Sequence, residues 1–362
     1  MGAAIKPGLA DPAFSGKLQS RTPGDISKAR GSQASPESQS TATERYERLR
    51  GKHCIRLLTL FPSSNEDDEI VCTLKEHDFD EAIPRFTALS YTWGSEEDPK
   101  SILLNGYRAD VRSNLHAALT HIRHAESEII FWIDALCINQ QSIEERNQQV
   151  PLMRDIYMVA EDVLAWLGPA TEGIDPESPH AAYEDVAYRP YWSRVWIIQE
   201  FVLGKKVLLQ CGHTLYDWEE LHESSPSKRE RCGGENLRRL LDLKRKFGAE
   251  RRERRGLEIA EAMMCAQRSE ATDPRDKVYG VLGLISRSSI STMLQPDYAL
   301  SICEVYSQVI KVLTLTPALL MQDLLSPDLK KHETLEQGCG KRCNGVTCGT
   351  VDKFESTIQL GR

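Results

Sequence analysis

Trp196 and Glu200 are four residues apart in the segment Ser-Arg-Val-Trp-Ile-Ile-Gln-Glu that ends at Glu200. On a helix, side chains with this spacing lie one above the other, so the segment predicts a carboxylate beside a large apolar ring. Desolvation by such a ring raises the pKa of a carboxyl group and suits it to acid–base chemistry or to stabilising an oxocarbenium ion. Glu200 is therefore our first catalytic candidate. The alternative is a structural carboxylate paired with Arg194 or another cation.

A second group of candidates follows the apolar run at residues 129–133, whose β-branched and aromatic residues are typical of a strand buried on both faces. Asp134, Asn139 and Gln140 come after this run, and Ser142 begins an S-x-x-E capping box that predicts the start of a helix. Open α/β sheets bind ligands in such polar loops, because the helix end supplies free N–H donors. The alternative is that these side chains only satisfy hydrogen bonds of the loop.

Two cations and two aromatic residues lie near these candidates in the sequence. Arg146 and Arg194 can form bidentate hydrogen bonds with phosphate groups, or pair with neighbouring carboxylates. Tyr91 and Trp93 can stack on a base, although their strand context favours packing in the core. Each of these residues therefore has both a binding interpretation and a structural one.

Thiol and metal chemistry have little support in the sequence. Cys137 would need a base to act as a nucleophile, and neither His121 nor His213 is placed by a recognisable motif. Near the C-terminus, four residues have a spacing that fits no common zinc site, so we expect no metal site: His332, Cys339, Cys343 and Cys348.

The hydrophobic pattern predicts the elements that position these residues. Strands are expected at 55–61, 70–74, 86–92, 102–104, 108–111, 129–134, 163–167 and 206–211. Helices are expected at 113–125, capped by Ser113, and at 142–160 and 192–202, with residues 169–190 as a loop and mostly helices after 217. Asn105-Gly106 predicts a tight hairpin turn. The strand–helix–strand order from 129 to 167 indicates a βαβ unit in a parallel sheet.

Three segments, in this order, resemble the signature blocks of the fungal heterokaryon incompatibility (HET) domain: residues 88–94, 131–140 and 193–200. Residues 145–168 also resemble that family, and residues 271–284 resemble a segment that usually follows the domain. The resemblance runs from about residue 46 to about residue 307. Each block alone is weak, but the ordered set is specific.

The spacing around Glu200 also resembles the S-x-W-C-x-x-E-L pattern of TIR domains, whose glutamate cleaves the glycosidic bond of NAD. The chain departs from that pattern, since one extra residue separates Ser193 from Trp196, and Ile197 and Phe201 replace the cysteine and the leucine. The resemblance implies an α/β fold with a TIR-like (flavodoxin-like) parallel-sheet core, added N-terminal strands and a helical C-terminal extension. It implies no cofactor, with NAD as a substrate of Glu200. The residues expected to bind it are Asp134, Asn139, Gln140, Arg146 and Trp196.

Composition bounds the remaining possibilities. The 362 residues are 40% hydrophobic and 27% charged, enough for one large or two modest domains. A net charge of −8 argues against sequence-independent binding to nucleic acids. The sequence has no apolar run of the roughly 18–20 residues that span a bilayer, and residues 1–6 lack the long apolar segment expected of a signal peptide. We therefore expect a cytoplasmic or nuclear protein with reduced cysteines.

The sequence predicts four parts. These are a disordered tail over 1–42, a HET domain over 43–222, a helical extension over 223–324 and a poorly ordered tail over 325–362, which we interpret as a truncated end. The resemblance implies fungal non-self recognition and programmed cell death, with protein partners and an active homo-oligomer that hydrolyses NAD. The alternative is a non-enzymatic death-signalling or scaffold module that acts by oligomerisation.

Overall fold

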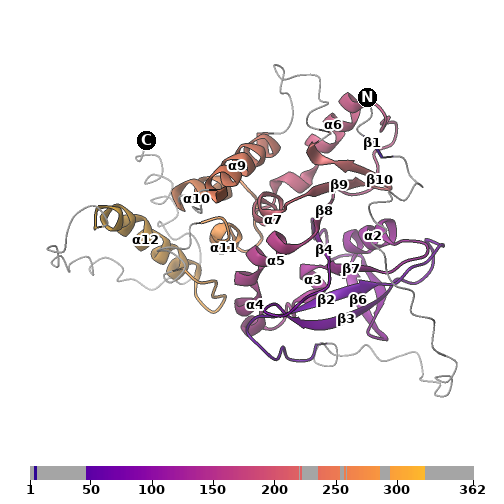
Figure 1. Cartoon of the computed structure of the whole chain (residues 1–362), viewed down its shortest axis with the longest axis horizontal. Coiled ribbons are helices and arrows are strands. Elements are labelled where there is room, and N and C mark those ends of the chain that lie inside the picture. The colour runs from indigo at the N-terminus through magenta and orange to yellow at the C-terminus, as the bar shows by residue number, and fades with distance from the viewer. Residues whose placement is uncertain are drawn as a thin grey trace. The chain divides into compact units, whose positions relative to one another are not determined.

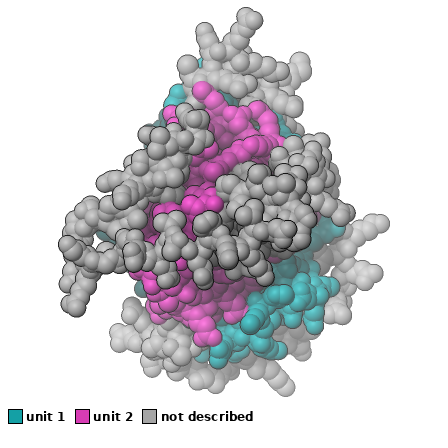
Figure 2. Space-filling model, turned by 90° about the vertical axis from the view of Figure 1, so that its left-hand side faces the viewer, with its two compact units in different colours: residues 1–139, 164–189, 206–232 teal, residues 140–163, 190–205, 233–362 magenta. Residues whose placement is uncertain are grey.

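The computed structural model describes residues 4–5, 46–219, 221, 235–252, 257, 259–285 and 294–322. The chain divides into two compact units, coloured separately in Figure 2. The first unit comprises residues 1–139, 164–189 and 206–232, and the second comprises 140–163, 190–205 and 233–362. Apart from Ala4–Ile5, the tails expected at 1–42 and 325–362 lie outside the described residues.

The first unit contains nearly all of one mixed sheet, which has ten strands among the described residues (Figure 1). In sheet order the strands are β1 (Ala4–Ile5), β10 (Thr214–Asp217), β9 (Val207–Cys211), β8 (Asp162–Trp166), β4 (Thr87–Tyr91), β7 (Ile129–Trp132), β2 (Cys54–Leu60), β3 (Val71–Asp78), β5 (Pro99–Leu104) and β6 (Tyr107–Arg112). The expected α/β class is confirmed as a mixed sheet accompanied by C-terminal helices.

β7 lies inside this sheet. It pairs in parallel with β4, where Thr87 is opposite Phe131 and Ala88 is opposite Trp132, and it pairs antiparallel with β2 on its other side. Phe131 and Trp132 are accordingly buried, as the apolar run predicts. Because β4 and β7 run in the same direction, the polar segments that follow them leave the sheet at the same edge.

The hairpin expected around Asn105-Gly106 is confirmed. β5 and β6 pair antiparallel from Leu104 opposite Tyr107 to Pro99 opposite Arg112. Asn105 and Gly106 have φ angles of 53° and 83°, the left-handed pair that a type I′ turn requires. The Asn105 side chain also accepts a hydrogen bond from the backbone N–H of Leu74 at 2.8 Å.

Helix α2 (Ser113–Ile122) covers this hairpin with the residues Leu115, Ala118, Leu119 and Ile122, whose spacing of three and four places them on one face. The expectation that Ser113 caps α2 is wrong. The N-cap residue is Arg112, which makes no side-chain capping bond, because β6 runs directly into the helix without a linker.

Two short helices of the first unit were not expected. α3 (Asp134–Cys137) begins at the residue that we expected to end the preceding strand. α6 (Pro179–Ala187) lies within the expected loop 169–190, with a proline in its first turn and Ala182 and Val186 buried one turn apart. Both are too short for hydrophobic periodicity to reveal them.

In the second unit, the prediction of a single helix at 142–160 is wrong, because this segment is not one continuous helix. It is divided into α4 (Ile143–Gln149), a 3₁₀ turn η2 (Val150–Leu152) and α5 (Met153–Val159). Pro151 explains the division, because it lacks an N–H donor and its ring clashes with the preceding turn. The expected cap is confirmed, since the Ser142 hydroxyl accepts from the Glu145 N–H at 3.2 Å.

Helix α7 (Ile197–Leu203) is the central helix of the second unit, and every one of its residues is buried. It packs against α5, α9 (Glu235–Arg252) and α11 (Asp276–Leu282), and the unit also contains α10 (Ile259–Gln267) and α12 (Ile302–Gln322). The start expected near Trp192 is a separate 3₁₀ turn, η3 (Pro190–Ser193). None of the described helices is both long and apolar enough to cross a membrane.

Candidate functional site

In the first unit, Trp93 and Asp134 come together at the edge where β4 and β7 end. The indole Nε1–H of Trp93 donates a hydrogen bond to Asp134 Oδ2 at 2.8 Å, and both side chains are half-buried. The other carboxylate oxygen accepts from the backbone N–H of Ala135 at 2.7 Å at the start of α3. A partly exposed carboxylate beside an indole is thus held in one orientation by two donors.

The turn after Trp93 is fixed by Asn114 and Arg112. Asn114 donates to the Thr92 carbonyl at 2.5 Å and accepts from Trp166 Nε1 at 3.0 Å. Arg112 donates to the Gly94 carbonyl at 2.9 Å, and its guanidinium lies 5.0 Å from the centre of the Trp93 ring. Gly94 has a φ of +77°, and a Cβ atom there would lie 3.1 Å from Cβ of Asn114, so glycine suits this position.

Cys137, at the end of α3, is unsuited to nucleophilic chemistry. It is fully buried, and burial raises the pKa of its thiol to about 12. Its sulfur lies 3.3 Å from the backbone N–H of Ile133, which donates to it. The thiolate, which is the nucleophilic form, is therefore strongly disfavoured. Asn139 and Gln140, the next candidates along the chain, have half-buried side chains.

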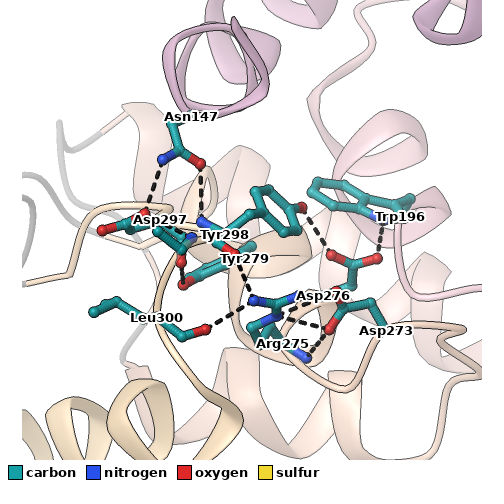
Figure 3. A network of polar contacts seen from close by, with 10 residues as sticks. Asn147, Trp196, Asp273, Arg275, Asp276, Tyr279, Asp297, Tyr298 and Leu300 are labelled. Atoms are coloured by element: carbon teal, nitrogen blue, oxygen red, sulfur yellow. Dashed lines mark hydrogen bonds and ion pairs between the residues drawn. The ribbon is translucent and has the colours of Figure 1, made fainter. Parts of the chain in front are cut away.

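A second polar cluster lies in the second unit around Asp276, the first residue of α11 (Figure 3). Asp276 Oδ2 accepts from Trp196 Nε1 at 3.1 Å, and Oδ1 accepts from the Tyr298 hydroxyl at 2.8 Å. Burial raises the pKa of the Asp276 carboxyl, although both hydrogen bonds favour its charged form. Trp196, predicted to bind a substrate, therefore directs its polar edge at a half-buried acid.

Tyr298 is held at both its backbone and its ring. Its backbone N–H donates to Asn147 Oδ1 at 2.9 Å, and Asn147 Nδ2 donates to Asp297 Oδ1 at 2.8 Å. Its ring packs edge-on against that of Tyr279, whose hydroxyl donates to the Asp297 carbonyl at 2.9 Å. Burial raises the pKa of the Tyr298 hydroxyl, which keeps it a hydrogen-bond donor to Asp276.

Arg275 donates several further hydrogen bonds within the same cluster. Its guanidinium donates to both carboxylate oxygens of Asp273, with Nη2 2.7 Å from Oδ2, and to the carbonyls of Tyr298 and Leu300 at 2.7 and 2.8 Å (Figure 3). Burial alone would raise the pKa of Asp273, but the hydrogen bonds from Arg275 outweigh it and lower that pKa. Asp273 is thus held as a carboxylate beside the Asp276 carboxyl.

Arg146 is another cation of this cluster, and no acid among the described residues forms a hydrogen bond with it. Its guanidinium carbon lies 4.3 Å from the centre of the Tyr298 ring, a cation–π contact. Within the described residues, the structure gives this guanidinium no hydrogen-bond or ion-pair partner. Arg146 can therefore accept an anionic group such as a phosphate without first breaking an ion pair.

Glu200, our catalytic candidate, lies one turn along α7 from Trp196, as the spacing predicted. Its backbone N–H donates to the Trp196 carbonyl at 3.2 Å. The residue is only 3% exposed, in a helix that is buried all round. The Trp196 indole nitrogen is directed at Asp276 rather than at Glu200.

The structure thus brings predicted residues together in two groups, one within each unit. Asp134 lies with Trp93 in the first unit, and Arg146 and Trp196 lie with Asp276 in the second. Our prediction that Asp134, Asn139, Gln140 and Glu200 share one crevice stays a prediction. The residues that sequence reasoning missed are Asn147, Asp273, Arg275, Asp276 and Tyr298. The Asp-Pro-Arg-Asp run that ends at Asp276 was a usable signal, because it places two carboxylates around an arginine.

Comparisons with known proteins agree with the first two of the three sequence blocks, residues 88–94 and 131–140. Residues 86–178 match the family described as "Heterokaryon incompatibility protein (HET)", and this segment includes Trp93 and Asp134. The Neurospora crassa protein "Heterokaryon incompatibility protein 6, OR allele" is 26% identical over 346 residues, which cover 70% of this chain and 51% of that protein. The chain thus spans about half the length of this curated relative. No solved structure matches it.

Proposed function

We propose that this chain, which carries a HET domain and is distantly homologous to a Neurospora incompatibility protein, acts in heterokaryon incompatibility. In this proposal it signals non-self recognition between fungal cells and leads to cell death. The family match over 86–178 carries the proposal. The Trp93–Asp134 pair supports it, because two of the sequence blocks that resemble the family meet in this hydrogen bond.

The enzymatic mechanism for this function is NAD hydrolysis in an oligomer with a TIR-like fold. Glu200 would stabilise the oxocarbenium ion that forms when the bond between ribose and nicotinamide breaks, and water would then attack the ribose carbon. Arg146, which has no hydrogen-bonded or ion-paired acid among the described residues, would bind a phosphate group. Trp196, Asp134, Asn139 and Gln140 are the other residues that this mechanism assigns to the substrate.

The alternative mechanism is a non-enzymatic module that signals by assembly, and the burial of Glu200 supports it. A carboxylate that is 3% exposed on a central helix cannot contact a substrate unless α7 or its neighbours move. The Trp196 indole N–H is also already bound to Asp276. In the conformation described, these observations favour structural roles for both residues, and we therefore propose assembly as the mechanism.

Expression in yeast or a filamentous fungus tests the function and separates the mechanisms. The full chain, Glu200→Gln and the control Glu219→Gln, which changes an exposed glutamate, are induced while viability and cellular NAD are followed. We expect death with unchanged NAD, equal in all three. Death with NAD loss that Glu200→Gln alone abolishes, in a variant with the wild-type melting temperature, would establish the enzyme instead. Cells that survive the wild-type chain would refute the incompatibility function.

A further inference from the structure

β6 is the last strand at one end of the sheet. Within the described residues it pairs only with β5, so its other edge is open. Residues flanking a two-residue hairpin turn form a hydrogen-bonded pair, and such pairs alternate with non-hydrogen-bonded ones. Counting from Tyr107, Arg108 and Asp110 turn their backbone N–H and C=O groups toward the open edge. An edge of this kind is a template for a further strand.

The side chains along this edge carry opposite charges two residues apart. Arg108 and Asp110 are both exposed and lie on the same face of β6. Within the described part of the chain, Asp110 has no hydrogen bond or ion pair. Arg108 makes only long contacts, 3.5 Å to Glu69 Oε1 and 3.5 Å to Ser101 Oγ. Contacts of this kind at an exposed position contribute little, so both charges are available to a partner.

We propose that two copies of this chain associate by antiparallel pairing of β6 with β6, centred on Ala109. A two-fold axis at Ala109 places Arg108 opposite the partner's Asp110, and Asp110 opposite the partner's Arg108. At both positions the backbone N–H and C=O groups point toward the open edge of β6, so each pair also exchanges backbone hydrogen bonds. Tyr107, which is 48% exposed, then lies opposite the partner's Val111, a favourable aromatic–β-branched pair.

The charges select this register over its neighbours. Centring the pairing on position 110 would place Asp110 opposite the partner's Asp110 and Arg108 opposite the partner's Arg112. Centring it on Arg108 would oppose two arginines. Like charges directly opposite destabilise a strand pair, whereas opposite charges stabilise it. The edge is therefore complementary to itself, as a symmetric dimer requires.

Pairing along β6 would supply an intermolecular contact for the assembly mechanism. The dimer proposal rests on the structure of β6 alone and does not depend on the proposed function. A strand edge is a small interface, so we expect a weak dimer with a micromolar dissociation constant. The test measures the mass of the purified full chain in solution and needs no cell death. Failure here would leave the incompatibility function untouched, and survival of the induced cells would leave the dimer untouched.

Sedimentation equilibrium of the wild type and of four variants tests the pairing. We expect Arg108→Asp and Asp110→Arg each to weaken the dimer about tenfold or more, because each places like charges opposite one another. Their equimolar mixture should form a heterodimer, and the double variant R108D/D110R should regain the wild-type constant. Glu97→Arg, an exposed charge reversal outside β6, is the control and should not change the mass.

Two results would overturn the pairing of β6 with β6. One is a wild-type chain that is monomeric throughout the micromolar range. The other is a dimer that resists both charge reversals in variants whose circular dichroism matches the wild type. The mixture and the double variant guard against misfolding, since a recovered dimer requires both copies to be folded. A double variant that is folded but monomeric would also refute the assigned register.

Discussion

The indole N–H of Trp93 donates a 2.8 Å hydrogen bond to Asp134 and joins the ends of two parallel strands. Trp93 follows β4, and Asp134 begins the short helix after β7. The carboxylate also accepts a hydrogen bond from the backbone N–H of Ala135, so it contacts both the residue that follows the neighbouring strand and the first turn of its own helix. Two segments that resemble the HET family separately are thus one structural feature.

This pair should be energetically coupled. We expect Trp93→Phe and Asp134→Ala to show a coupling free energy of about 1–2 kcal/mol in a double-mutant cycle, the range for a partly exposed hydrogen bond to a charged group. Urea denaturation measures it. The control cycle pairs Trp93→Phe with Glu177→Ala, an exposed loop residue, and should be additive. Additivity in the first cycle would show that the bond does not hold the strand ends together.

The Asp276 carboxyl should make stability depend on pH. Burial raises its pKa in the folded state, so the folded protein holds this proton more tightly than the unfolded chain does. The stability that this proton contributes is complete below the ordinary value of 3.8 and is lost as the pH rises through the folded-state pKa. The free energy of unfolding of the wild type minus that of Asp276→Asn should therefore fall as the pH rises above about 4. A difference that is independent of pH would contradict the assigned direction.

Arg275 should be poorly replaced by lysine. An ammonium group cannot reproduce the two-point contact with Asp273 together with the bonds to the Tyr298 and Leu300 carbonyls. We expect Arg275→Lys to lower the free energy of unfolding by about 1–3 kcal/mol and to speed hydrogen exchange at residues 294–300. Arg245→Lys, at an exposed ion pair, is the matched control and should change little. Equal effects of the two substitutions would argue against a stabilising role for the hydrogen bonds of Arg275.

Cys137 should be unreactive in the folded protein. Its thiol is buried with a pKa raised to about 12, so alkylation at pH 8 should modify it only after unfolding. Cys303, which is half-buried, should be modified sooner. Mass spectrometry of the digested protein identifies the labelled positions. Rapid and complete labelling of Cys137 in folded protein would restore it as a candidate nucleophile.

The local elements were largely predictable from the sequence. The apolar run at 129–133 predicted a buried strand, the Asn105-Gly106 pair predicted the hairpin, and Ser142 predicted the start of α4. Each of these signals acts over a few residues, through burial, a left-handed turn or a side-chain cap. The missed break at Pro151 was equally local and could have been predicted.

The arrangement of the candidate residues was decided only by the tertiary structure. The sequence predicted that Trp196 and Glu200 are one helical turn apart, but not that the indole nitrogen would bind Asp276, 80 residues further on. The stacking of Arg146 on Tyr298 likewise joins distant segments. Helical spacing determines which side chains share a face, because 3.6 residues complete a turn. It does not determine what that face meets, because the partner depends on how distant elements pack to bury their apolar surfaces.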